Sequence, residues 1–351
     1  MTNKERFYAT IERQPVDRPA SWLGLPVAES EKKLLQFFGV DSINKIKIIL
    51  DDDIWPVEVP YKHPPINHIA CAFDFAKKLP GYEERTLTEP GFFENYFDSA
   101  AVSDFPWPDP ANHIDHEQCI KALEVLPENR ALMGMMWSAH FQDACAAFGM
   151  ENALMKMLLE PEMFRAVIER ITKFYLDANR IFYEAGKGKL DAVLLGNDMG
   201  SQAGLMMSPD QFREFVLPGI RQLVDQAKSY DLKVIYHSCG AIYDIIPDLI
   251  ATGVDAIHPI QALATNMEPE KLKSSFGAEV SFCGGVDVQE LLVNGSPDEV
   301  RDKVRQLKTL FSTGLIISPS HEAILPDVAP ENIQAMFDAI KESHYHCDNR
   351  I

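Results

Sequence analysis

The 351-residue sequence has few basic residues and no long apolar run. Lysine and arginine together number 33 against 52 aspartates and glutamates, which gives a formal net charge of −19. A surface of this charge lacks the basic stripe that attracts nucleic acid or an anionic membrane. No apolar stretch approaches the roughly 20 residues that span a bilayer. We therefore expect no transmembrane helix, no membrane association and no nucleic-acid partner.

Cysteine is also scarce, and the six residues lie far apart. No signal-like apolar run follows Met1, so we expect reduced thiols, no disulfide framework and a cytoplasmic location. The hydrophobic content of 46% is ordinary for a globular protein and is enough to build a large core. The cysteines are Cys71, Cys119, Cys145, Cys239, Cys283 and Cys347.

The second half of the chain repeats a short apolar β-rich run, a polar or glycine-containing break and a helical segment. Runs that are apolar on both faces belong to parallel sheets covered by helices, and such units close into a barrel or a doubly wound sheet. Capping serines before proline mark helix starts at Ser208 and Ser296. The strands expected here are 192–196, 233–236, 256–259, 280–283 and 315–318.

The first half is less regular but supplies three further strands, at 21–27, 45–50 and 131–137, and a helix at 3–13. Two long helices are expected at 144–158 and 161–185. Residues 52–115 are rich in proline and aromatics, which predicts an irregular lid or surface excursion. With eight strands, the fold class we predict is α/β, a single TIM-type (β/α)8 barrel domain over residues 1–351 with this excursion near its amino terminus.

Polar residues follow the expected strands of the second half at their carboxyl ends. In barrels this end carries the active site, so five consecutive loops are expected to line one mouth. The residues are Asn197 and Asp198 after the first of these strands, His237 and Cys239 after the second, His258 and Gln261 after the third, Cys283 and Asp287 at the fourth, and His321 and Glu322 after the last.

His237 and Cys239 are two residues apart, and positions i and i+2 of a strand lie on one side of it. With His321 they supply one thiol and two imidazoles, the ligand count of a catalytic zinc with one position open. A buried cysteine beside a hydrogen-bonded histidine, and a solvent-facing His321, are the alternatives from the residues alone. Cys283 is an alternative ligand or a small buried residue, and Asp198 is a general base, a partner of a ligand histidine or a helix cap.

Several motifs along almost the whole chain resemble the uroporphyrinogen decarboxylase superfamily. The resemblance implies one TIM-type barrel and leaves two branches: decarboxylases of haem synthesis, and zinc-dependent methyltransferases that exchange a methyl group with a separate corrinoid protein. The segments that carry it are Arg6-Phe7, 15–19 (PVDRP), 198–202 (DMGSQ) with 208–209 and 212–213, 237–240 (HSCG), 253–255 (GVD), 284–287 (GGVD) and 318–321 (SPSH).

The two branches differ in the residues that they use: arginines that pair with substrate carboxylates in one, and zinc ligands in the other. The decarboxylase branch carries an arginine-rich segment directly after its Val-Asp-Arg-Pro motif, whereas the next arginine after Arg18 is here Arg85. Lysines in between lack the planar fork that pairs carboxylates bidentately. The methyltransferase branch carries H-x-C plus a late cysteine as zinc ligands. His237 and Cys239 match that pattern, and His321 stands where the late cysteine is expected.

The resemblance therefore implies a zinc-dependent methyltransferase that works with methylcobalamin or another corrinoid on a partner protein. The small substrate is a methyl ether, alcohol, thiol or tetrahydrofolate. A Cys/His/His set would leave Zn²⁺ at +1, a stronger Lewis acid than the neutral Cys/Cys/His set, which favours oxygen substrates. We expect zinc ligation by His237, Cys239 and His321, proton transfer by Asp198 and Glu322, and substrate binding by Asn197, Gln202, His258, Gln261 and Asp287.

Two other functions are left open by the sequence: decarboxylation of another carboxylated substrate, and a non-catalytic barrel that binds a tetrapyrrole or corrinoid. Metal content separates the first from the methyltransferase, and turnover separates the second. The direction of methyl transfer and the oligomeric state, including a homodimer, are also left open.

Overall fold

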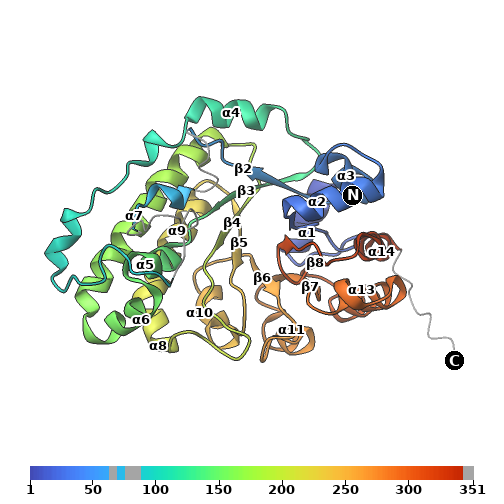
Figure 1. The fold of residues 1–351 in the computed structure, drawn as a ribbon. Coiled ribbons are helices and arrows are strands. Elements are labelled where there is room, and N and C mark those ends of the chain that lie inside the picture. The colour runs from blue at the N-terminus through green and yellow to red at the C-terminus, as the bar shows by residue number, and fades with distance from the viewer. Residues whose placement is uncertain (63–68, 76–87, 343–351) are drawn as a thin grey trace.

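The computed structural model describes residues 1–62, 69–75 and 88–342. Its centre is a sheet of seven parallel strands that curls into a TIM-type barrel with helices outside it (Figure 1). The strand order in the sheet follows the chain, as successive βα units produce. The strands are β2 Ile54–Glu58, β3 Ala131–Trp137, β4 Ala192–Gly196, β5 Lys233–His237, β6 Ala256–Ile260, β7 Ser281–Val286 and β8 Leu315–Pro319, with a separate parallel pair of β1 Leu25–Pro26 and β9 Ala323–Ile324.

The helices begin largely where the capping signals predict. Ser208 and Ser296 each form a capping box with the residue three positions on, which confirms both predicted starts. The helices are α1 Asn3–Ile11, α2 Ala28–Phe38, α3 Ile43–Leu50, α4 His116–Glu124, α5 His140–Phe148, α6 Met150–Leu159, α7 Pro161–Ala185, α8 Pro209–Gln211, α9 Leu217–Ser229, α10 Ile246–Ile250, α11 Pro269–Phe276, α12 Leu291–Asn294, α13 Pro297–Leu310 and α14 Pro330–Lys341. Short 3-10 turns lie at η1 Ile69–Ala72, η2 Ser99–Asp104, η3 Pro110–Asn112 and η5 Tyr243–Ile245, and a π-turn lies at η4 Phe212–Val216.

Two of the predicted elements are wrong. Residues 45–50 form part of helix α3 and not a strand, and the strand β2 follows it at Ile54. The burial of Ile46 and Leu50, with Ile48 and Ile49 exposed, has the helical spacing of four residues and not the period of two. The predicted helix at 144–158 is two helices, α5 and α6, which are interrupted at Gly149.

The barrel interior is filled by side chains that alternate along each strand. Ala131, Met133 and Met135 of β3 belong to the inner cluster. The neighbouring strands contribute Ile54 from β2 and Ala192 and Leu194 from β4. Helix α1 places Phe7 and Ile11 in the same inner cluster, which also contains Cys283. This apolar plug fills the barrel, so polar chemistry is confined to the strand ends.

The gap between β8 and β2 is spanned by residues 20–26, which we term the closing segment. On one side Trp22 N–H donates to the carbonyl of Ile317 at 3.1 Å, and on the other Ser21 N–H donates to Oδ2 of Asp53 at 2.8 Å. Leu23 N–H donates to Asp52 Oδ2 at 3.0 Å. On the β2 side, the carboxylates of Asp52 and Asp53 therefore take the place of backbone carbonyls as acceptors. The predicted strand at 21–27 is thus regular only at Leu25–Pro26.

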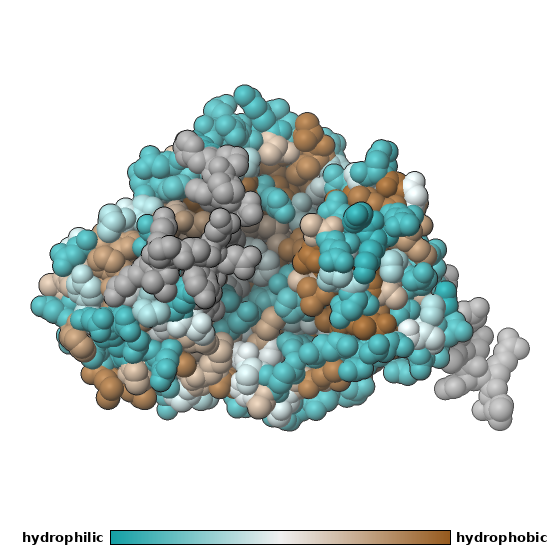
Figure 2. Space-filling model, in the orientation of Figure 1, coloured by the Kyte–Doolittle hydropathy of each residue, from teal (hydrophilic) through white to brown (hydrophobic). Residues whose placement is uncertain are grey.

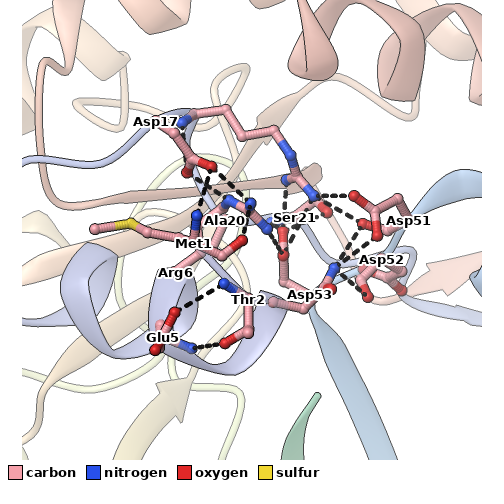
Figure 3. A network of polar contacts seen from close by, with 12 residues as sticks. Met1, Thr2, Glu5, Arg6, Asp17, Ala20, Ser21, Asp51, Asp52 and Asp53 are labelled. Atoms are coloured by element: carbon pink, nitrogen blue, oxygen red, sulfur yellow. Dashed lines mark hydrogen bonds and ion pairs between the residues drawn. The ribbon is translucent and has the colours of Figure 1, made fainter. Parts of the chain in front are cut away.

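Asp53 is also the centre of a buried ion-pair network (Figure 3). Its carboxylate accepts from Arg6 Nη1 at 2.7 Å and from Arg18 Nη1 at 2.6 Å. Arg6 pairs in addition with Asp17, and Arg18 with Asp51. Arg6 and Arg18, the arginines of the Arg6-Phe7 and PVDRP motifs, therefore hold α1 and the closing segment against β2.

Within the proline-rich span 52–115, Ile54–Glu58 form strand β2 of the barrel, so the predicted excursion is not irregular throughout. The turns η2 and η3 and the ring of Phe73 pack on α7. Phe73 lies 4.5 Å from Phe174 between ring centroids, and Phe93 and Trp107 stack at 6.1 Å in the same aromatic cluster. These rings extend the core outside the barrel. Residues 63–68 and 76–87 of the span, including Arg85, lie outside the described residues, as does Cys347.

The visible surface is mainly hydrophilic. Figure 2 shows hydrophilic residues spread over this face, which is hollowed near its centre. Among the described residues, none of the helices combines the length and the apolar character needed to cross a membrane.

Candidate metal centre at the barrel mouth

The candidate site is the next layer of inward-facing residues above the apolar plug. Two positions beyond Ile235 on β5 comes His237, and two beyond Ala256 on β6 comes His258. The strand register places Gly196, His237 and His258 side by side on β4, β5 and β6. A Cβ on Gly196 would lie 2.6 Å from Cβ of His237, so only glycine lets these two strand ends approach this closely.

Three donor atoms of different kinds converge at the ends of β4 and β5. His237 Nε2 lies 3.1 Å from Asp198 Oδ1 and 3.3 Å from Cys239 Sγ, and the three atoms lie within 4.8 Å of one another. Asp198 is held in place because its Oδ1 accepts from the Cys239 N–H at 3.0 Å and its Oδ2 accepts from Gln142 Nε2 at 3.3 Å. The group is thus oriented before any ligand binds.

The other ring nitrogen of His237 faces a second polar group. His237 Nδ1 lies 2.8 Å from His258 Nδ1 and 3.4 Å from Glu322 Oε2. His258 is buried, and its Nε2 has no hydrogen-bond partner among the described residues. Both ring nitrogens of His237 therefore have polar neighbours: Asp198 and Cys239 at Nε2, and Glu322 and His258 at Nδ1.

The protonation of the centre follows from these contacts. Burial lowers the pKa of His237, but Glu322 and the hydrogen bond to Asp198 outweigh it and hold that pKa well above its usual value. Burial and the neighbouring His237 hold the pKa of His258 well below its usual range. Burial raises the pKa of Cys239. Without a metal, these contacts favour the protonated form of His237, the neutral form of His258 and the thiol form of Cys239.

His321 lies across the mouth but outside both groups of donor atoms. Its ring centroid is 6.1 Å from that of His237, and its Nδ1 accepts from the N–H of Ala323 at 3.0 Å. Cys283 is fully buried in the inner cluster beside Ser318, and burial raises its pKa to about 12. The predicted ligands His237 and Cys239 thus come together with Asp198, and the role of His321 as a ligand stays a prediction.

The donor set fits a zinc ion. With bonds of about 2.0 to 2.3 Å, neighbouring ligand atoms of a tetrahedral site lie about 3.3 to 3.7 Å apart. The separations of 3.1 and 3.3 Å around His237 Nε2 are close to this spacing before any adjustment. Zinc ligand histidines also place their other ring nitrogen against a carboxylate or another hydrogen-bond acceptor, as Glu322 and His258 are placed here.

The expected substrate-binding residues have varied surroundings. Asn197 is buried, and it donates to Tyr236 and accepts from the N–H of Phe141, so it links α5 to β4 and β5. The Asp287 carboxylate accepts from three successive N–H groups, beginning with Gln289, and caps the turn after β7. Gln202 donates to Gln289, Gln261 accepts from the N–H of Gly240, and His258 faces His237. Their roles toward a substrate stay predictions.

Two aromatic residues at the site were not predicted. Trp137, the last residue of β3, lies edge-on to His237 with ring centroids 5.2 Å apart. The ring centroid of Trp22, in the closing segment, lies 5.1 Å from that of His258. The rule that places functional residues at the carboxyl ends of barrel strands points to Trp137 as much as to His237, because the strand at 131–137 is predicted from the sequence.

Gly24 positions the loop that carries Glu322. Its φ is +85°, and a Cβ there would lie 2.5 Å from the carbonyl oxygen of Glu322, while Leu25 N–H donates to the same oxygen. Gly24→Ala is expected to lower the free energy of unfolding by about 1 to 3 kcal/mol, because it adds a clash to a left-handed backbone.

The matched control for this substitution is Gly188→Ala, which has φ +76° but nothing within 4 Å of an added Cβ. Urea denaturation of both variants separates the two costs. An equal loss in the two variants would show that the contact with Glu322 contributes nothing.

A TIM-type barrel with polar residues gathered at the carboxyl ends of its strands has the arrangement of a barrel enzyme. The sequence model of uroporphyrinogen decarboxylase (URO-D) matches residues 82–343, and the chain belongs to this family.

Known proteins similar to the chain carry two kinds of name. A uroporphyrinogen decarboxylase of Chlorobium phaeobacteroides is 29% identical over 227 residues, which cover 61% of this chain and 60% of that protein. A methylated-thiol–coenzyme M methyltransferase of Methanosarcina mazei is 27% identical over 208 residues, which cover 59% of this chain and 52% of that protein. The chain thus matches less than two thirds of the length of each of these two relatives.

A solved methyltransferase from Methanosarcina mazei has the same fold, with a TM-score of 0.71 over 97% of this chain and 98% of its own. Its sequence identity to this chain is 16%, so the likeness establishes the barrel fold alone.

Proposed function

We propose that the protein is a zinc-dependent methyltransferase that moves a methyl group between a small substrate and the cobalt of a separate corrinoid protein. The observation that carries the proposal is the convergence of Asp198, His237 and Cys239 at the barrel mouth. The resemblance to corrinoid-dependent methyltransferases supplies the partner, and the methyltransferase among the relatives supports the reaction class.

In this proposal Asp198, His237 and Cys239 hold the metal. When bound, zinc would supply Lewis acidity toward a substrate oxygen or sulfur. Glu322 and His258 keep the remaining proton of His237 on Nδ1 and leave Nε2 free to bind. Cys239 must lose its proton on metal binding, because its pKa is raised by burial in the metal-free protein.

With Asp198 as a ligand, the formal charge of the centre is zero and not the +1 of a Cys/His/His set. The charge of the metal then no longer favours an oxygen substrate over a thiol. Glu322 and His321 lie 3.5 Å apart at the edge of the site and are the groups left to manage a substrate proton. The choice of substrate falls to the residues around them.

The substrate and the corrinoid together account for every bond and electron pair in the transfer. For a methyl ether, the carbon–oxygen bond breaks, its electron pair stays on the oxygen, and that oxygen takes a proton. The new cobalt–carbon bond uses the electron pair of Co(I), which becomes formally Co(III). We also propose that residues 1–351 form one domain and that the protein is cytoplasmic.

Removal of zinc is expected to abolish methyl transfer, and its return is expected to restore it. The purified protein should contain about one zinc per chain, and a chelator should stop formation of methylcobalamin from cob(I)alamin and a methyl donor, followed by absorbance. Cys239→Ala should lose both metal and activity, whereas Cys119→Ala, at another buried thiol in α4, should keep both. A metal-free protein of full activity would remove the proposal.

A further inference from the structure

A cavity of about 300 Å³ lies at the barrel mouth beside His321. Its walls come from the loops after β6, β7 and β8 and from the chain that leads to α14. We propose that this cavity binds the methyl-bearing substrate, that the substrate is a small, uncharged, oxygen-bearing ring compound, and that Asp327 excludes its carboxylated analogues. This rests on the proposed function, because it names the substrate class of the same site.

The charge of the lining excludes anions. No lysine or arginine is among the residues that line the cavity, and Asp327 contributes an exposed carboxylate at its rim. Within the described residues Asp327 has no ion pair. A second carboxylate, that of Glu322, lies 3.5 Å from Nδ1 of the lining residue His321. The nearby Lys33 ammonium donates to the Pro326 carbonyl and is not part of the lining. A carboxylate entering this cavity would therefore lose water without a lysine or arginine of the lining to pair with, and it would face like charges, both of which cost free energy.

Apart from the Asp327 carboxylate, the polar groups of the lining that are free to bind a ligand are hydrogen-bond donors. Gln261 Oε1 accepts from the N–H of Gly240 at 2.8 Å, which fixes the amide orientation and leaves its NH₂ group for a ligand. Gln289 Oε1 likewise accepts from Gln202 at 3.3 Å. Because His321 Nδ1 accepts from a backbone N–H, neutral His321 carries its proton on Nε2. Three donor groups, the NH₂ groups of Gln261 and Gln289 and the Nε2–H of His321, are therefore free for acceptor atoms such as methoxy, hydroxyl or carbonyl oxygens.

The remaining walls are apolar and the volume is small. Val288, Ala323, Leu325 and Val328 offer aliphatic surface for the face of a ring, and half of Leu325 is exposed before a ligand binds. Ligand cavities run from about 300 to 1,000 Å³, so this one lies at the lower limit. It suits one substituted ring and not a porphyrinogen with four rings and eight carboxylates.

The test compares two probes that differ by one carboxylate, 2-methoxyphenol and 4-hydroxy-3-methoxybenzoate. Calorimetry of the zinc-loaded protein should give at least about tenfold tighter binding of the uncharged probe, a difference of about 1.4 kcal/mol. Asp327→Lys should reduce this ratio to one or reverse it, and Gln261→Leu should weaken the binding of both probes. Asp225→Lys, on the outside of α9, makes the same change of net charge and should leave the ratio as it is.

Equal binding of the two probes by the wild-type protein, or an unchanged ratio in Asp327→Lys, would overturn the inference. So would methyl transfer from another donor when neither probe binds, and that outcome would leave the proposed methyltransferase intact. Selective binding of the uncharged probe without any methyl transfer would support the cavity assignment while the proposed function failed.

Discussion

Asp198→Ala is expected to lower the affinity for zinc more than about 100-fold, whereas His321→Ala should lower it by less than about 10-fold. Loss of a group that only orients a metal ligand costs about 10 to 100-fold, so loss of a ligand should exceed that range. Asp198 Oδ1 lies 3.1 Å from His237 Nε2 in the donor group, while His321 Nδ1 is engaged by Ala323. This expectation rests on the proposed ligand set of Asp198, His237 and Cys239, in which Asp198 takes the place that the sequence analysis gives to His321.

The measurement is a competition titration against a chromophoric chelator, which reads metal affinity without activity. Glu322→Gln provides the reference point, because it keeps the size of the group facing His237 Nδ1 and removes its charge. We expect its loss to fall within about 10 to 100-fold. If His321→Ala loses as much affinity as Cys239→Ala, while Asp198→Ala binds normally, the Cys/His/His set is correct and Asp198 is free to act as a base.

The strand ends could be predicted because they depend on local pattern and a general rule. Apolar runs of the right length give β4 to β8, and the barrel rule places His237, His258 and Glu322 at one end of it. That Asp198 points at His237 depends on the side-chain directions of two residues on different strands. A single sequence does not give these directions.

The errors have a similar physical origin. The run Ile46 to Leu50 is apolar enough for a strand, and only its burial against neighbouring elements shows the helical period. The closing segment lacks a regular ladder because Asp52 and Asp53 accept its N–H groups, a tertiary contact that no local pattern indicates. The cavity beside His321 is formed by three loops, whose relative positions the sequence leaves undetermined.

The second large effect is expected at the opposite end of the barrel. Asp53→Asn should lower the free energy of unfolding by about 3 to 5 kcal/mol, the cost of removing one partner from a buried ion pair. Asp53 is 0% exposed, and its two oxygens accept from Arg6, Arg18 and both the N–H and Oγ of Ser21. An asparagine amide would turn donors toward these donors and leave two buried guanidinium groups short of a counter-charge.

Two neighbouring aspartates make this prediction specific to Asp53. Asp17 also pairs with Arg6 but its side chain is 47% exposed, so Asp17→Asn should cost at most about 1 kcal/mol. Burial raises the pKa of Asp52 to about 7, so Asp52→Asn removes less charge at neutral pH and keeps an oxygen for the Leu23 N–H. Urea denaturation followed by tryptophan fluorescence should rank the losses with Asp53 the largest. Equal losses at all three positions would mean that closure of the barrel depends on total negative charge at this end, and not on the carboxylate that joins α1, the closing segment and β2.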